Sequence, residues 1–195
     1  MRAEVITTGT ELLLGEIVDT NAAFLSRELA ELGIDLLRRT TVGDNQGRLA
    51  EAIRRALDEN DLVLLSGGLG PTADDCTAEA LARALEVPLV LDPEARRQVE
   101  EWSAARRRAI GPGDLKQARL RESARPLLNR RGSAPGILWR GNWNGRPVLV
   151  VALPGVPAEL RGMFSTEVRP LLGGSGAVIR SRVLHVVGIG EPEVD

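Results

Sequence analysis

Residues 61–77 read Asp-Leu-Val-Leu-Leu-Ser-Gly-Gly-Leu-Gly-Pro-Thr-Ala-Asp-Asp-Cys-Thr, and their order indicates the architecture of the chain. The first six residues form an almost continuous apolar run, which is typical of a parallel strand buried on both faces. Three glycines follow within four positions, and a helical pattern begins at Thr77. A strand, a glycine turn and a helix in this order predict an α/β domain that binds its ligand where the strand ends.

The segments on either side of this stretch alternate between strand and helix patterns, which favours an α/β fold with a mostly parallel sheet. Asn144-Gly145 lies between two apolar runs and predicts an added β-hairpin. We expect strands at 3–8, 34–42, 61–66, 87–91, 137–139, 148–151 and 180–187, and helices at 21–32, 46–60, 77–85, 93–109 and 157–172.

The composition narrows the classes of function. The 195 residues carry 25 Lys and Arg against 27 Asp and Glu, a net charge of −2, so nucleic-acid binding is disfavoured. No apolar run approaches the roughly 20 residues of a membrane helix, and we expect a cytoplasmic protein. The chain has one cysteine, one histidine and no tyrosine. Catalysis would therefore depend on carboxylates, lysine, hydroxyls, backbone amides or a metal. We expect Cys76 and His185 to be structural.

The glycine turn predicts a phosphate site, because Gly67, Gly68 and Gly70 allow the backbone N–H groups to approach an anion closely. The alternative is a tight turn whose helix is capped by Asp75 or Thr77. Gly68 to Ala73 also fits the G-x-G-x-x-A pattern of dinucleotide sites, with Asp92 as the following acid. However, Asp74 and Asp75 would repel a bare phosphate, and they favour a site in which Mg²⁺ bridges acid and phosphate.

Three further loops follow predicted strands, so we expect them at the same edge of the sheet. They contribute Thr8, Gly9 and Glu11 after the first strand, Asp44 after the second, and Pro154-Gly155 before the last helix. Each of these loops also fits an ordinary turn between a strand and a helix. Their expected convergence with the glycine turn favours a binding site.

Taken together, these loops resemble the molybdopterin-binding domain family that includes MogA, MoaB and the N-terminal part of CinA, and CinA most of all. The resemblance covers nearly the whole chain. It rests on the strings 8–15, 19–21, 42–44, 66–72 with Asp74, Asp75 and Thr77, 116–118, Asn129, 132–136 and 153–160.

The resemblance implies a three-layer α/β/α fold and a homo-oligomer, either a dimer or a trimer. CinA-like domains are associated with divalent-metal-dependent hydrolysis of ADP-ribose to AMP and ribose 5-phosphate. CinA proteins usually continue into further domains, so we expect the binding domain at 1–172 and a linker with the start of a second domain at 173–195. The resemblance gives no basis for amidohydrolase activity in this chain.

We therefore expect hydrolysis of a small nucleotide, a nucleoside diphosphate sugar, with Mg²⁺ as the divalent cation. The alternatives are a non-catalytic pterin- or nucleotide-binding and oligomerisation module, and a molybdopterin adenylyltransferase. Asp44, Asp75 and Lys116 are the candidate catalytic residues, although Lys116, the only lysine, also fits a surface position. Asp74 and Asp75 are the candidate metal ligands. The candidate phosphate- and nucleotide-binding residues are Thr8, Gly9, Glu11, Asn21, Ser66, Gly67, Gly68, Gly70, Thr72, Asn129, Pro154 and Gly155.

Overall fold

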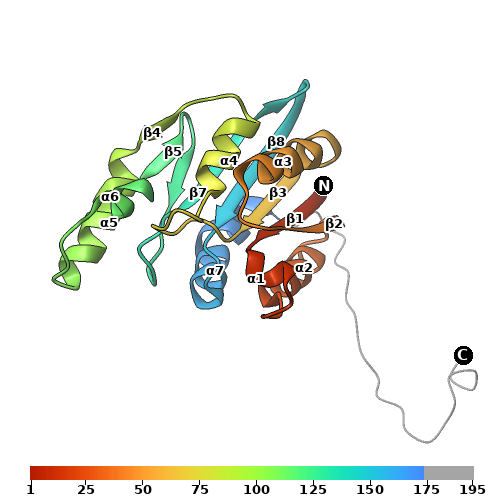
Figure 1. Ribbon diagram of the computed structural model, residues 1–195. Coiled ribbons are helices and arrows are strands. Elements are labelled where there is room, and N and C mark those ends of the chain that lie inside the picture. Colours follow the sequence, from red (N-terminus) through yellow and green to blue (C-terminus); the bar gives the residue numbers. More distant parts are fainter. Residues whose placement is uncertain (174–195) are drawn as a thin grey trace, which may run out of the picture.

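The computed structural model describes residues 1–173. A central sheet of six strands has the order β2-β1-β3-β8-β7-β6, and β4 and β5 form a separate antiparallel pair (Figure 1). The predicted strand at 180–187, His185 and nearly all of the expected linker lie outside the described residues. The strands are β1 Arg2–Thr8, β2 Asp35–Val42, β3 Leu62–Ser66, β4 Leu89–Leu91, β5 Arg119–Arg121, β6 Arg125–Leu127, β7 Gly136–Trp143 and β8 Arg146–Leu153.

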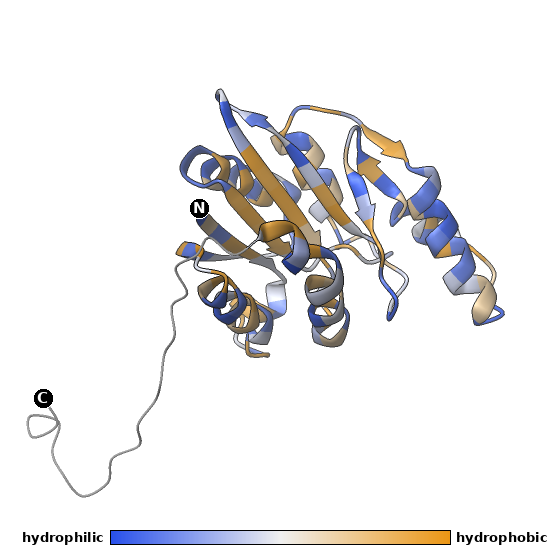
Figure 2. Cartoon of the chain, turned by 180° about the vertical axis from the view of Figure 1, so that it is seen from behind, coloured by the Kyte–Doolittle hydropathy of each residue, from blue (hydrophilic) through white to orange (hydrophobic). Residues whose placement is uncertain are grey.

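Helices cover both faces of the central sheet, which confirms the three-layer α/β/α fold. Alternate residues of β3 point to opposite faces: Leu62 and Leu64 pack with α2 and α7, whereas Val63 and Leu65 pack with α3 and α4. Figure 2 shows the apolar central strands between helices that are polar on their outer sides. The helices are α1 Thr10–Leu13, α2 Thr20–Glu31, α3 Gln46–Glu59, α4 Thr77–Ala84, α5 Pro93–Ala105, α6 Pro112–Lys116, α7 Pro157–Met163, a π-helical segment Phe164–Val168 and α8 Arg169–Leu172.

The local signals in the sequence explain several boundaries. Asp19 caps α2 by accepting a hydrogen bond from the Ala22 N–H at 2.8 Å, and Gly33 follows that helix with φ of 67°. Asn144 and Gly145 have φ of 50° and 77°, as a two-residue hairpin turn between β7 and β8 requires. The predicted hairpin is therefore confirmed.

The strand predicted at 87–91 forms as β4, but it does not join the central, mostly parallel sheet. β4 pairs antiparallel with β5 and lies outside the central sheet, while β8 occupies the place beside β3 and runs parallel to it. β8 is buried at six of its eight positions, whereas no residue of β4 is buried. A central position needs apolar side chains on both faces, and only β8 provides them.

Two helices also differ from their predicted extents. α5 ends at Ala105 rather than near 109, because Arg107 adopts a φ of 53° that no α-helix accommodates. The helix predicted at 157–172 contains a π-helical segment at Phe164–Val168. Pro170, just beyond it, has no N–H for the hydrogen bond to residue 166, and the wider turn accommodates this loss.

The acid that completes the dinucleotide pattern has a structural role instead. Asp92 is the N-cap of α5, and its Oδ1 accepts hydrogen bonds from the N–H groups of Glu94 at 2.9 Å and Ala95 at 2.8 Å. We predict that Asp92→Ala lowers the free energy of unfolding by about 1 kcal/mol. Asp92→Asn keeps a capping oxygen and is expected to change it by only a few tenths of a kcal/mol. Urea unfolding checks both values, and equal losses in the two variants would contradict the capping role.

No helix in the described part of the chain is long and apolar enough to cross a membrane.

Candidate functional site

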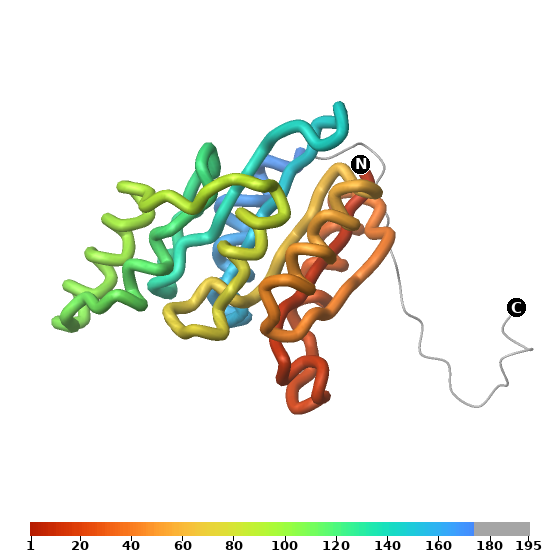
Figure 3. The backbone as a smooth tube through the Cα atoms, turned by 45° about the horizontal axis from the view of Figure 1, so that its top comes forward, coloured from red at the N-terminus to blue at the C-terminus, as the bar shows by residue number. Residues whose placement is uncertain are grey.

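The loops that follow β1, β2, β3 and β8 meet around a cavity of about 530 Å³ at one edge of the central sheet. Figure 3 shows the loop after β1 and the glycine loop projecting from the same end of the molecule. The expected convergence of the loops is confirmed. The cavity is lined by Thr8, Gly9, Glu11, Asp44, Gly67, Gly68, Leu69, Gly70, Pro71, Asp74, Asp75, Gln117, Ser133, Ala134, Pro154, Gly155, Val156 and Glu159.

The glycine loop is held to the sheet and to α4 by its own backbone. The Gly67 N–H donates to the Leu153 carbonyl at 3.0 Å. Contrary to our expectation, it is therefore not free to bind a phosphate. The Thr77 hydroxyl donates to the Gly67 carbonyl at 2.8 Å, and the Thr77 N–H donates to the Gly68 carbonyl at 3.0 Å. Both glycines have positive φ, 102° and 65°.

Three N–H groups of this loop remain for a ligand. Within residues 1–173, no hydrogen bond engages the N–H groups of Gly68, Leu69 and Gly70. All three residues line the cavity. Successive free N–H groups in a tight turn form a concave donor surface of the kind that binds anions. Gly68, Leu69 and Gly70 are therefore the residues of this loop whose N–H groups are left for an anion.

The alternative interpretation of this turn, a helix cap by Asp75 or Thr77, is not what the structure shows, because Cys76 is the N-cap of α4 and makes no side-chain capping bond. Asp75 instead accepts hydrogen bonds on Oδ2 from the Thr72 N–H at 2.9 Å and the Thr72 hydroxyl at 2.6 Å. The same carboxylate lies against Gly70, where a Cβ would come within 2.5 Å of Oδ2. The hydrogen bonds between Asp75 and Thr72 thus stabilise the loop. They occupy Oδ2 of Asp75 and leave its Oδ1 for a ligand.

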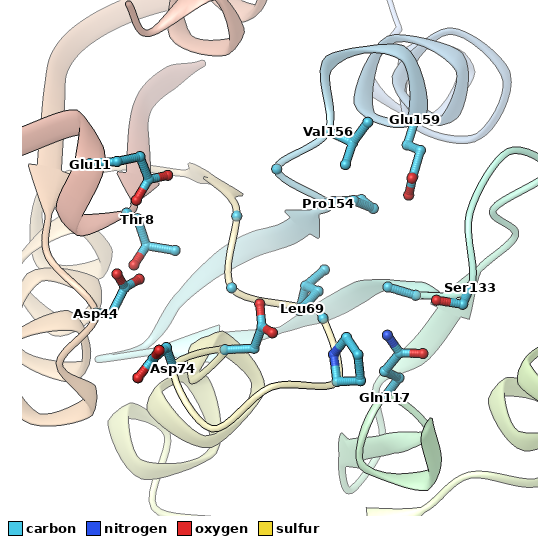
Figure 4. Close-up of a pocket in the computed structure, with 18 residues that line it drawn as sticks. Thr8, Glu11, Asp44, Leu69, Asp74, Gln117, Ser133, Pro154, Val156 and Glu159 are labelled. Atoms are coloured by element: carbon cyan, nitrogen blue, oxygen red, sulfur yellow. The ribbon is translucent and has the colours of Figure 1, made fainter. Parts of the chain in front are cut away.

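Carboxylates gather on one side of the cavity (Figure 4). We call Glu11, Asp44 and Asp74 the acidic side. Asp44 Oδ2 accepts a hydrogen bond from the Thr10 N–H at 2.8 Å, which fixes its position. Asp74 is exposed, and no hydrogen bond or ion pair within the described residues engages its carboxylate.

These side chains fit a cation that phosphate helps to hold. Carboxylate oxygens are the ligands that Mg²⁺ takes, usually one or two of them together with phosphate oxygens. Residues 1–173 contain no cluster of three or more histidine, cysteine or acidic side chains arranged to hold a metal without further ligands. A cation at these carboxylates would therefore need further ligands, such as the oxygens of a phosphate.

Lys116 lies behind the glycine loop rather than in the cavity. Its ammonium group donates to the Thr72 carbonyl at 2.7 Å and to the Asp75 carbonyl, and it forms an ion pair with Glu79 at 3.6 Å. These contacts hold the segment that carries Asp74. Lys116 is thus a positioning residue in this structure, and its direct action on a reacting phosphate stays a prediction.

Asn21 and Ser66 border a smaller side pocket of about 100 Å³ next to the main cavity. The Asn21 amide donates to the Ser66 hydroxyl at 3.1 Å and to the Gly155 carbonyl at 2.7 Å. These bonds tie α2 to the loops after β3 and β8. Thr8 lines both pockets, and its buried hydroxyl has no partner among the described residues.

Asn129 does not face the main cavity. Its Oδ1 accepts from the N–H groups of Arg131 at 3.0 Å and Gly132 at 2.9 Å, and its Nδ2 donates to Ala134 O at 2.9 Å and Glu159 Oε2 at 2.7 Å. Because these bonds occupy both ends of the amide, the expected contact of Asn129 with a nucleotide is not available. Asn129 instead shapes the loop that brings residues 133 and 134 to the cavity.

The sequence reasoning missed Gln117, Ser133 and Glu159 as site residues. All three line the cavity, and they come from the loop after α6, the loop before β7 and the start of α7. Each belongs to one of the strings that carry the family resemblance. Only that resemblance could have indicated Gln117 and Ser133, because no strand directly precedes either of them.

Cys76, expected to be structural, is half-buried next to the acidic side. Burial raises the pKa of its thiol, and the carboxylates of Asp44 and Glu79 raise this pKa further. We predict that iodoacetamide alkylates Cys76 at pH 7 at least about tenfold more slowly in the folded chain than in urea, measured without added metal, because the thiolate is the reactive form. In the folded chain, the alkylation rate is expected to keep rising at pH values at which the thiol of the unfolded chain is already fully ionised. Equal rates in the two states would contradict this environment.

A cavity at the carboxyl ends of parallel strands, lined by free backbone N–H groups and carboxylates, is the place at which open α/β domains bind small ligands. The model of the family described as "probable molybdopterin binding domain" matches residues 4–174. The chain belongs to this family, in the group of CinA and the competence-damage inducible proteins.

The relatives agree with this assignment. A "putative competence-damage inducible protein" from Moorella thermoacetica is 50% identical over 198 residues, which is 100% of this chain and 47% of the relative. The crystal structure of CinA from Thermoplasma acidophilum matches with a TM-score of 0.80 and 35% identity, over 89% of this chain and 99% of that one. The tungsten cofactor synthesizing protein MoaB from Pyrococcus furiosus, 19% identical, covers 88% of this chain and 94% of its own with a TM-score of 0.57, which shows a shared fold. The chain spans about half the length of the curated relatives it matches.

Proposed function

We propose that this chain hydrolyses the pyrophosphate bond of a nucleoside diphosphate sugar with the help of a divalent cation, and that ADP-ribose is its first candidate substrate. The observation that carries the proposal is the juxtaposition, in one cavity, of the free N–H groups of Gly68 to Gly70 and the acidic side. N–H groups alone would suit any anion. Carboxylates beside them require a cation to offset the repulsion from a phosphate.

In this proposal, backbone N–H groups bind the phosphate and carboxylates bind the cation. The N–H groups of Gly68, Leu69 and Gly70 would hold the phosphate oxygens, where they can stabilise the charge that develops as water attacks. Asp74, together with Asp44 or the free oxygen of Asp75, would hold Mg²⁺. The cation, when bound, offsets phosphate charge and lowers the pKa of a bound water.

The chemistry balances without a further reactant. The oxygen of water forms a bond to one phosphorus, the bond from that phosphorus to the bridging oxygen breaks, and AMP and ribose 5-phosphate leave with the release of a proton. The Thr10 N–H engages Asp44 through Oδ2. The Oδ1 of Asp44 would accept a hydrogen bond from the attacking water. The cavity volume of about 530 Å³ lies in the ordinary range for small-ligand sites.

The test is the incubation of the 195-residue chain with ADP-ribose and Mg²⁺ or Mn²⁺, followed by chromatography of AMP and ribose 5-phosphate. We expect both products in equal amounts, and none when EDTA removes the cation. If the folded chain binds AMP but releases no product with several divalent cations, hydrolysis by this chain is excluded and a binding module remains. Sedimentation of the same sample tests the expected dimer or trimer.

A further inference from the structure

The cavity has a second side whose chemistry differs from that of the acidic side. Gln117, Ser133 and Glu159 lie across the cavity from Glu11, Asp44 and Asp74 (Figure 4). We call the first group the amide side. Its one carboxylate, Glu159, is held through Oε2 by the Asn129 amide at 2.7 Å. A phosphate and its cation suit the acidic side, so the uncharged part of a nucleotide is left for the amide side.

Gln117 is the polar group of the amide side that lacks partners. Gln117 is 6% exposed as a whole residue, and its Oε1 is buried without a hydrogen bond. No hydrogen bond within residues 1–173 engages its Nε2 either. A buried acceptor left unpaired costs free energy, and a ligand that donates to Oε1 would recover it.

The surroundings of Gln117 suit a flat ring. Leu69 and Ala134 line the cavity beside it and are 7% and 6% exposed. Pro71 adds a further apolar surface. Apolar walls next to a single polar amide are the usual surroundings of a heteroaromatic ligand, because the ring packs against the walls and its edge forms the hydrogen bonds.

We propose that the amide side is the nucleoside subsite and that Gln117 selects adenine. The Gln117 Nε2 would donate to N7 of the base, and its Oε1 would accept from the 6-amino group, which is the pairing by which glutamine side chains read adenine. Hypoxanthine has a carbonyl oxygen in place of the amino group, and this oxygen would face Oε1 with no proton between them. The free Oε1 of Glu159 is available to accept from a ribose hydroxyl, as carboxylates do in other nucleotide sites. The inference rests on the proposed function for the placement of the phosphates.

The experiment measures the binding of AMP and of IMP to the 195-residue chain by calorimetry in the presence of Mg²⁺. We expect the wild-type chain to bind AMP about 10- to 100-fold more tightly than IMP. Gln117→Met, which keeps the length of the side chain but removes both polar atoms, is expected to bind the two nucleotides equally. Gln117→Glu loses the donor to N7, which both bases carry, but keeps an acceptor for the 6-amino group, so it is expected to bind AMP more weakly and still to prefer AMP over IMP. Gln46→Met, at an exposed position on α3, is the matched control and should keep the wild-type preference.

Each outcome is decisive. A wild-type chain that binds AMP and IMP equally or binds neither, or a folded Gln117→Met variant that keeps the wild-type preference, would overturn the inference. If Gln117→Met does not fold, Gln117→Leu, which also removes both polar atoms, carries the comparison. Because binding needs no turnover, the two proposals fail separately. Selection of AMP through Gln117 without release of AMP from ADP-ribose would exclude the hydrolase and support the adenine subsite.

Discussion

Gly67→Ala is expected to lower the free energy of unfolding by about 3 to 5 kcal/mol, as the sum of backbone strain and overpacking. The φ of Gly67 is 102°, a conformation that alanine rarely adopts. A Cβ at this position would also come within 2.5 Å of the Thr8 carbonyl oxygen. That oxygen belongs to β1, which lies between β2 and β3 in the sheet. Neither the Thr8 carbonyl nor the glycine loop can therefore move without a cost in free energy. Equilibrium unfolding in urea measures the loss.

Gly145→Ala is the control for this substitution. Gly145 also has a positive φ, 77°, but a Cβ there would meet no atom within 4 Å. We expect it to cost only the strain of the backbone, about 1 to 2 kcal/mol. A loss at Gly67 no larger than the loss at Gly145 would contradict the close packing of the glycine loop on β1.

Under the proposed function, Asp74→Asn is expected to lower the rate of AMP formation from ADP-ribose at least about 100-fold, because it removes a charged oxygen ligand from the proposed cation. The stability should change by no more than about 0.5 kcal/mol, since the Asp74 side chain is exposed and no hydrogen bond or ion pair of the described residues engages it. Steady-state rates over a series of Mg²⁺ concentrations separate a weaker affinity for the cation from a slower reaction.

The matched control is Asp35→Asn. Asp35 is also exposed, but it starts β2, at the end of the sheet opposite to the cavity. It should therefore keep the wild-type rate. An Asp74→Asn variant as active as Asp35→Asn would remove Asp74 from the candidate metal ligands and leave Asp44 and Asp75.

The sequence was informative wherever a signal is local. The apolar run before Gly67 and the Asn144-Gly145 turn each specify their own structure, and each was predicted correctly. The rule that ligands bind at the carboxyl ends of parallel strands then placed most of the candidate residues around one cavity.

The failures concern choices that depend on distant parts of the chain. The place beside β3 goes to β8, which lies about eighty residues later, because β8 has the apolar surface that β4 lacks. Whether Asn129 faces a ligand or holds its own loop depends on Glu159 and on the backbone of residues 131–134. The partners of Gly67 and of Lys116 are likewise carbonyls that no sequence pattern reveals.

In the proposed phosphate site, the N–H groups of Gly68, Leu69 and Gly70 bind the phosphate of a nucleotide. Amide resonances in ¹⁵N–¹H NMR spectra test it when AMP and Mg²⁺ are added to the labelled chain. We predict that the resonances of these three residues shift the most, and that the Gly67 resonance shifts less because its N–H already donates to the Leu153 carbonyl. Large shifts confined to other parts of the chain, with these three resonances unmoved, would contradict the account.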